Sequence, residues 1–324
     1  DKRSCGVGLR GFESHPPHHF NVDIGKEPIS VGTYKSGVRT KRPRRRTNAL
    51  ARARILAHKA GNDLTHFLGE GMAVKKEIVV LSPHLDDAVF DCSDHILAWK
   101  RDALPVRVVT AFTVFSSRML SSYARSYIRL SHCESLAEFE RVRVCEDMRA
   151  MNALRVSWNH LGFTDAAFRC NEGKPIYPDS QRMFSGAVSL HDFTLLAELK
   201  QAIEPFKNQS RFVVPLGVGK NVDHILVRKA AEELIVPAET YYYLEYPYAL
   251  FGPNWTRNHV VKVVAAKKSI KWTSQAKRRL LQLYSSQYPG VFSRPVLPLI
   301  SSALTRYYPE IILCPEERAD LIIP

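Results

Sequence analysis

No run of apolar residues in this sequence is long enough to cross a lipid bilayer. A membrane-spanning helix needs about 20 consecutive apolar residues, whereas the best candidates, Ile78 to Leu81 and Val296 to Ile300, are only as long as a strand. The first five residues also lack the apolar core of a secretory signal. We therefore expect a protein without a membrane span, located in the cytoplasm.

Cysteine is scarce as well. The 324 residues contain six cysteines, which lie far apart and form no C-x-x-C pair. This pattern argues against a cysteine zinc site and against a disulfide framework, so we expect reduced thiols. The G-x-S-x-G elbow of serine hydrolases is absent too. The segment Gly217 to Lys220 lacks the spacing of a nucleotide-binding phosphate loop.

Positive charge is abundant but unevenly spread. The formal net charge is +14, and residues 1–71 hold 14 Lys and Arg against 6 Asp and Glu, so more than half of the excess lies there. This stretch has scattered Gly and Pro and the basic run Lys41 to Arg46. We predict that residues 1–71 form a basic, poorly ordered extension and that residues 72–324 form the folded domain. The run favours a solubilising tail over a nucleic-acid partner.

From Glu77 onward, apolar strands alternate with amphipathic helices. Strands are expected at Ile78–Ser82, Val106–Phe112, Arg155–Phe163, Phe212–Leu216, Thr240–Glu245 and Val260–Ala265. Helices are expected at Asp87–Lys100, Leu136–Leu154, Asp192–Ile203, Val222–Leu234 and Thr273–Tyr284, with a further short one at Asn48–Lys59. The alternation predicts an α/β fold with a mostly parallel, Rossmann-like sheet that is covered by helices on both faces. The active site is then expected at the carboxyl ends of the strands.

The motif Ser82-Pro-His-Leu-Asp-Asp-Ala88 lies where the first strand ends and its helix begins. His84 and Asp87 are close enough in such a turn to bind one zinc ion through a nitrogen and an oxygen. Asp86 is then free to take a proton from water as that water attacks a carbonyl. Two acids at the start of a helix are also common caps, so this motif alone does not decide between the two roles.

A second motif strengthens the metal hypothesis. Gly217-Val-Gly-Lys-Asn-Val-Asp-His224 again follows a strand and opens a helix. Two strand ends of one parallel sheet present their loops on the same edge, so His224 is able to complete a set of two histidines and one aspartate. A catalytic zinc site needs three such protein ligands and an open fourth position.

These residues resemble the PIG-L/LmbE-like de-N-acetylases, zinc hydrolases that remove acetyl groups from N-acetylglucosaminyl and related compounds. The resemblance covers roughly residues 74 to 290 and follows the family's order of motifs. The matching segments are Pro83–Asp87, Arg143–Asp147, Asp165–Arg169, Asn221–His224, Tyr243–Tyr248 and Lys277–Gln287.

The resemblance implies a role for each matching residue. The expected metal ligands are His84, Asp87 and His224, with Zn²⁺ as the cofactor. The expected catalytic residues are Asp86 as general base, Asn221 and Asp223, of which Asp223 orients an imidazole. Arg169 and Glu245 are expected to line the substrate pocket, although structural ion pairs explain them equally well. The implied partner is a small N-acetylated sugar or glycoconjugate. Its specificity is expected to depend on two loops, Ser116–His132 and Arg169–Ser189.

Two departures from the family pattern matter for function. Leu85 replaces a proline, which should be tolerated because its side chain need not touch the metal. Asn221 replaces the first histidine of H-x-D-H, and an amide donates a hydrogen bond but does not shuttle a proton. Besides a hydrolase, the sequence therefore allows a catalytically impaired binding protein, or a nucleic-acid binder that acts through its basic extension. It leaves the oligomeric state open, and also whether the metal is zinc or another divalent ion.

Overall fold

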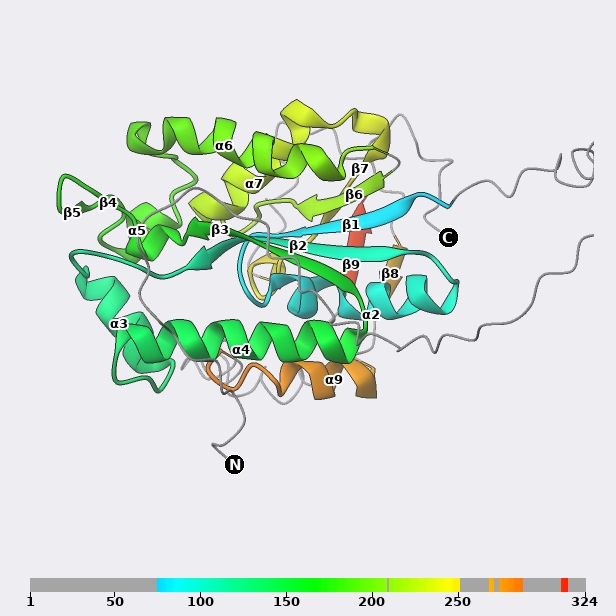
Figure 1. The fold of residues 1–324 in the computed structure, drawn as a ribbon, viewed down its shortest axis with the longest axis horizontal. Coiled ribbons are helices and arrows are strands. Elements are labelled where there is room, and N and C mark those ends of the chain that lie inside the picture. The colour runs from blue at the N-terminus through cyan, green and yellow to red at the C-terminus, as the bar shows by residue number, and fades with distance from the viewer. Residues whose placement is uncertain (1–74, 209, 251–267, 271–273, 288–309, 314–324) are drawn as a thin grey trace, which may run out of the picture. The chain divides into compact units, whose positions relative to one another are not determined.

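The computed structural model describes residues 75–208, 210–250, 268–270, 274–287 and 310–313. Within these ranges the main sheet has seven strands, in the order β3-β2-β1-β6-β7-β9-β8 (Figure 1). The strands are β1 (Glu77–Ser82), β2 (Val106–Val114), β3 (Ser157–Thr164), β6 (Ser210–Pro215), β7 (Thr240–Tyr243), β8 (Lys268–Ile270) and β9 (Glu310–Leu313). The helices are α2 (Asp87–Arg101), α3 (Ser122–Leu130), α4 (Leu136–Leu154), α5 (Ser180–Met183), α6 (Phe193–Ile203), α7 (Val222–Leu234) and α9 (Gln275–Leu281).

Successive strands are added to the sheet first on one side of β1 and then on its other side. Strand β1 pairs in parallel with β2 on one side and with β6 on the other. The chain first adds β2 and β3, and then crosses over to add β6 and β7, which are also parallel. The last two strands are antiparallel to their neighbours: β9 pairs with β7, and the edge strand β8 pairs with β9. The predicted mostly parallel fold is confirmed, and the reversal between β1 and β6 is where such sheets bind ligands.

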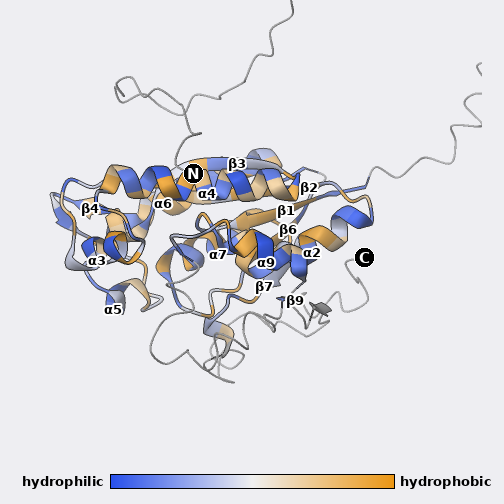
Figure 2. Cartoon of the chain, turned by 90° about the horizontal axis from the view of Figure 1, so that it is seen from below, coloured by the Kyte–Doolittle hydropathy of each residue, from blue (hydrophilic) through white to orange (hydrophobic). Residues whose placement is uncertain are grey.

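Alternate residues of β1 face opposite layers of helices, as a strand buried on both faces requires. Val79 and Leu81 pack in one apolar cluster with residues of α6 and α7. Ile78 and Val80 pack in a second cluster with residues of α2, α4 and α9. Figure 1 shows these two sets of helices on opposite faces of the sheet. In Figure 2 strand β1 is almost wholly hydrophobic, whereas α4 carries residues of both kinds.

The helices whose bounds were predicted best begin with a residue that caps the helix N-terminus. Leu136–Leu154 and Val222–Leu234 have the expected bounds. Ser135 accepts a hydrogen bond from the amide of Glu138 at the start of the first, and Asn221 accepts one from Asp223 at the start of the second. The expected helix at Asn48–Lys59, the expected strand at Val260–Ala265 and the boundary at residue 71 lie outside the described residues.

One predicted loop is wrong. The segment Ser116–His132 was expected to be a loop, but it contains helix α3, whose first turn is capped by Ser121. The helix buries only Ala124 and Ile128, four residues apart, so its apolar pattern is too sparse to identify it from sequence. The segment Arg169–Ser189, also expected to be a loop, contains the small hairpin of β4 (Cys170–Asn171) and β5 (Lys174–Pro175) and the single turn α5. Among the described helices, none is long and apolar enough to cross a membrane.

Candidate metal centre

The turn between β1 and α2 is closed by side chains of its own motif. The Ser82 hydroxyl donates to the carbonyl of His84 at 2.7 Å and accepts from the amide of Ala88 at 3.1 Å. The amide of His84 donates to Oδ2 of Asp87 at 2.8 Å. Leu85 is fully buried in an apolar cluster. Contacts within the motif itself therefore hold His84 and Asp87 together.

The second motif is held by a helix cap. Gly217 begins the turn after β6 with a φ of 79°, a conformation that glycine adopts without strain. Asn221 then caps α7, because its Oδ1 accepts from the amide of Asp223 at 2.9 Å. This cap places Asp223 and His224 in the first turn of α7.

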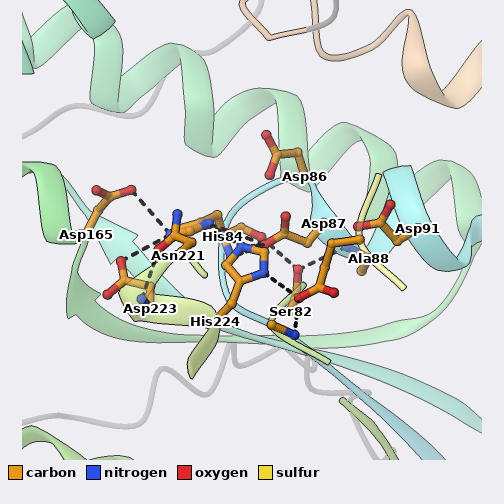
Figure 3. Close-up of polar contacts among 12 residues, drawn as sticks. Ser82, His84, Asp86, Asp87, Ala88, Asp91, Asp165, Asn221, Asp223 and His224 are labelled. Atoms are coloured by element: carbon orange, nitrogen blue, oxygen red, sulfur yellow. Dashed lines mark hydrogen bonds and ion pairs between the residues drawn. The ribbon is translucent and has the colours of Figure 1, made fainter. Parts of the chain in front are cut away.

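Three donor atoms from the two motifs converge at the ends of neighbouring strands (Figure 3). His84 Nδ1 lies 3.4 Å from Asp87 Oδ2 and 3.3 Å from His224 Nε2. His224 Nε2 lies 3.5 Å from Asp87 Oδ2. Ligands about 2.0 to 2.2 Å from a tetrahedral zinc are separated by about 3.3 to 3.6 Å. The triangle matches one face of that tetrahedron, so the predicted set of His84, Asp87 and His224 fits a divalent ion.

Both histidines turn their outer ring nitrogen toward a carboxylate. His84 Nε2 lies 3.1 Å from Asp223 Oδ2, and His224 Nδ1 lies 3.1 Å from Glu245 Oε1. Because an ionised carboxylate only accepts hydrogen bonds, we assign the protons to these outer nitrogens. The other two ring nitrogens, His84 Nδ1 and His224 Nε2, then carry lone pairs that face each other and Asp87. Such outer partners fix the orientation of metal-binding histidines.

A second group of donors is less suited to a metal. His84, Asp165 and Asp223 also bring one donor atom each into proximity. This group offers only one nitrogen donor and two carboxylates. Its nitrogen is Nε2 of His84, which already faces Asp223. Asp223 is already engaged, since it pairs with Arg169 at 2.6 Å and accepts from the amide of Ala166 at 2.9 Å. The first group is the better candidate.

Comparison with known proteins connects this geometry with a family. Residues 79–235, which include all three donors, match the PIG-L family, described as GlcNAc-PI de-N-acetylase. The chain carries a PIG-L family domain. It is 24% identical over 188 residues to the 2'-N-acetylparomamine deacetylase of Niallia circulans, a match that covers 54% of this chain and 68% of the relative.

Solved structures of deacetylases share the fold of this PIG-L domain. The zinc-inhibited form of teicoplanin deacetylase Orf2 is 20% identical with a TM-score of 0.57, over 73% of this chain and 97% of the neighbour. The A40926 pseudoaglycone deacetylase Dbv21 is 18% identical with a TM-score of 0.54, over 74% and 97%. At these identities the likeness establishes the fold alone.

Asp86 is separate from the donor triangle of the PIG-L domain. Figure 3 draws no dashed line from the carboxylate of Asp86 to the other side chains shown. Its Oδ2 accepts from Nη1 of Arg143, a fully buried residue of α4, at 3.2 Å. Burial raises the pKa of Asp86 above its ordinary value, although the charge of Arg143 opposes this. A raised pKa suits a carboxylate that has to take up a proton.

Arg169 and Glu245 lie behind the donor triangle. Arg169 pairs with Asp223 at 2.6 Å and with Asp192 at 3.0 Å, and only 8% of it is exposed. Glu245 is 1% exposed and accepts from His224 and from the amide of Gly217 at 2.6 Å. These contacts favour the ion-pair alternative for Arg169, and for Glu245 they favour a role in orienting His224. Sequence reasoning assigned no role to Arg143 or Asp165, although both belong to segments that resemble the family.

The charges of the cluster favour a bound cation. Burial raises the pKa of Asp87, but His224 and His84 outweigh it and lower this pKa to about 2. Burial lowers the pKa of His224, but Asp87 and Glu245 outweigh it and raise this pKa above its ordinary value. The aspartate therefore stays ionised, and a cation competes with protons for the histidine nitrogens.

Proposed function

We propose that this chain is a metal-dependent hydrolase that removes the acetyl group from an N-acetylated amino sugar or a related glycoconjugate. The observation that carries the proposal is the triangle of His84, Asp87 and His224, whose edges fit zinc and whose outer contacts fix both imidazoles. The PIG-L match, and relatives that are themselves deacetylases, support the reaction class.

Each residue then has a defined task. His84, Asp87 and His224 would hold a divalent ion, which would supply a Lewis acid and lower the pKa of water. Asp86 takes the proton of the water that attacks the acetamide carbonyl, and Arg143 holds the carboxylate of Asp86 in place. Asp223 and Glu245 keep the imidazoles aligned. The products are acetate and a free amine.

Asn221 favours a second candidate function. Its Oδ1 is occupied by the cap of α7, so only its amide nitrogen is available for the reaction, as a hydrogen-bond donor. An amide does not protonate a leaving amine. A catalytically impaired domain that keeps the metal and binds a glycoconjugate is consistent with this residue.

Metal content and turnover test both candidates. We would measure the metals in purified wild type, His84→Ala and the control His191→Ala, which changes an exposed histidine outside the triangle. Acetate release from N-acetylglucosamine derivatives would be followed in parallel. We expect about one equivalent of zinc in wild type and control, loss of metal in His84→Ala, and metal-dependent acetate release.

The other outcomes separate the alternatives. Bound metal without turnover on any derivative would favour the impaired binding protein. Absence of metal from every preparation would overturn the triangle as a metal site. A metal other than zinc would leave the proposed reaction intact and correct the cofactor.

A further inference from the structure

The backbone that carries Glu245 lies beyond the end of its strand. Strand β7 makes its last pairings at Tyr243, which lies opposite Pro215 of β6 and Ile312 of β9. Glu245 comes after this point, outside the strands that the structure describes. Its carboxylate nevertheless meets Nδ1 of His224 at 3.1 Å. A contact other than the ladder of the sheet therefore has to hold the chain here.

The peptide unit between Glu245 and Tyr246 is held at both of its polar groups. The carbonyl of Glu245 accepts from the amide of Ala249 at 3.0 Å, a local contact that closes the turn into the short helix η5 (Tyr248–Leu250). The amide of Tyr246 donates to Oδ1 of Asp91 at 3.0 Å. Because a peptide unit is planar and includes the Cα of Glu245, these two contacts fix the point from which the Glu245 side chain starts.

Asp91 joins this peptide unit to a distant part of the chain. It lies on α2, 155 positions before Tyr246. Asp91 is 1% exposed and Tyr246 is 7% exposed, so solvent hardly reaches the contact. A buried amide that lost its acceptor would carry the full cost of its desolvation. Loss of the Asp91 carboxylate would therefore favour a shift of the chain at Tyr246.

Helix α2 thereby carries one donor of the triangle and also the support of a second donor. Asp87 and Asp91 lie four residues apart, so their side chains share one face of the helix. Figure 3 shows both carboxylates at the start of this helix. Asp87 Oδ2 lies 3.5 Å from Nε2 of His224, and Asp91 acts on the same imidazole through Glu245. One helix thus fixes the spacing between two of the three donors.

We propose that Asp91 is a positioning residue of the metal centre, which holds the peptide unit after Glu245 so that this carboxylate orients His224 for a metal. The inference rests on the proposed function, because it takes the triangle as a metal site. It does not depend on the reaction that the metal supports.

Position 91 requires an accepting oxygen rather than a negative charge. Burial raises the pKa of Asp91 well above its usual range, and the charge of Asp87 raises this pKa further. The neutral acid still accepts a hydrogen bond through its carbonyl oxygen, as the side chain of asparagine does. Leucine is similar in size and has no acceptor. Substitution by asparagine and by leucine therefore separates the contact from the charge.

The test is the zinc affinity of the full chain, measured by competition with a chelator, together with the melting temperature of the metal-free protein. We expect Asp91→Leu to weaken zinc binding by about tenfold, as the loss of support for a group that orients a ligand predicts. Asp91→Asn should bind zinc within about threefold of wild type, because it keeps the acceptor.

The matched control is Asp94→Leu. Asp94 is also a buried aspartate of α2 that accepts from a backbone amide, that of Ser274 at 3.2 Å. Its loss should lower the melting temperature but leave zinc affinity within about twofold of wild type, because Asp94 supports no residue that orients a ligand.

Three outcomes would overturn the role of Asp91. These are an unchanged zinc affinity in Asp91→Leu, an equal loss of affinity in Asp94→Leu, and an equal loss in Asp91→Asn. If Asp91→Leu does not fold, Asp91→Ala takes its place, and hydrogen exchange in the wild type measures the same contact. The Tyr246 amide should exchange slowly, and exchange at the rate of an exposed loop would overturn the inference. Zinc binding by the wild type without acetate release would count against the proposed hydrolase alone, and the affinities would still decide the role of Asp91.

Discussion

At the scale of single residues, the orientation of the two imidazoles depends on carboxylates outside the donor triangle. Glu245 accepts from His224 and Gly217 through Oε1 and from Val218, at 3.3 Å, through Oε2. A side chain with two accepting oxygens suits this position, because both backbone amides point at it. His224 is consequently held with one ring nitrogen toward Asp87.

We expect Glu245→Gln to weaken metal binding by about tenfold to a hundredfold, the usual effect of losing an outer carboxylate partner. In the variant, the NH2 of the glutamine side chain would face a backbone N–H, so one of the hydrogen bonds that Glu245 accepts would be lost. The substitution would also remove the negative charge next to His224. The measurement is zinc affinity by competition with a chelator, together with the melting temperature of the metal-free protein. The control is Glu233→Gln, at an exposed position paired with Lys200. An unchanged affinity in Glu245→Gln would show that the orientation of His224 does not depend on this carboxylate.

Asn221→His should have two opposite effects. Loss of the helix cap should destabilise the fold by about 1 kcal/mol, because Oδ1 no longer accepts from Asp223. Histidine at this position supplies the proton that asparagine lacks, so acetate release should rise. Asn221→Asp, which keeps a capping oxygen, serves as the comparison. A rate that stays the same or falls would argue against a family-type proton donor at this position.

At the scale of elements, a buried carboxylate of β9 joins the sheet to two helices. Glu310 opens β9 and is fully buried. It accepts from the amides of Asp94 and His95 in α2, each at 2.9 Å, and from Nζ of Lys277 in α9 at 2.6 Å. Lys277 also donates to the carbonyl of Phe90 at 2.6 Å. These contacts attach the antiparallel strand β9 to α9 and to α2, the helix that begins at Asp87 of the first motif.

We expect Glu310→Gln to destabilise the protein by about 3 to 5 kcal/mol at neutral pH, because it removes the carboxylate that buried Lys277 contacts. Burial raises the pKa of Glu310, but Lys277 and His95 outweigh it and lower this pKa from 4.5 to about 2. The stability from Glu310 is therefore complete above about pH 4.5 and is lost as the pH falls toward 2. Over that window the difference between wild type and variant should narrow by about 3 kcal/mol.

Urea unfolding at a series of pH values would measure this effect. Glu239→Gln is the control, because it breaks the more exposed pair with Lys76 and should cost less than about 1 kcal/mol. A difference between wild type and Glu310→Gln that stays constant from pH 5 to 2 would contradict the assigned role of Glu310.

At the scale of the whole molecule, charge and the candidate site belong to different parts of the chain. Residues 1–71 carry more than half of the net charge of +14, whereas all three donors lie between residues 84 and 224. Deleting residues 1–71 should therefore leave acetate release within about twofold of wild type. It should also remove most salt-sensitive affinity for DNA, if the full chain has any.

A matched variant separates the charge of this segment from its length. Changing the five cations of the basic run 41–46 to glutamine should reduce the salt dependence without changing turnover. Loss of turnover on deletion would instead assign the extension a part in the active site. Strong, salt-sensitive DNA binding that survives the deletion would place a nucleic-acid site in the domain.

Much of the arrangement was predictable from local sequence. The apolar strand Ile78–Ser82, the capped helices α4 and α7, and the positions of the two motifs follow from periodicity and cap residues. Because parallel strand ends share one edge of a sheet, the convergence of His84 and His224 was also predictable. Helix α3 was not, since it buries too few side chains to leave a pattern.

The sequence by itself determined the fold class, the family resemblance and the donor types, because these depend on residues that lie close together in the chain. Only the tertiary structure decided which ring nitrogen each histidine turns inward, and that Glu245 orients His224 from behind. It also decided that Arg169 joins Asp192 to Asp223. These contacts join residues up to 139 positions apart, and the order of strands, together with the reversal between β1 and β6, brings them together.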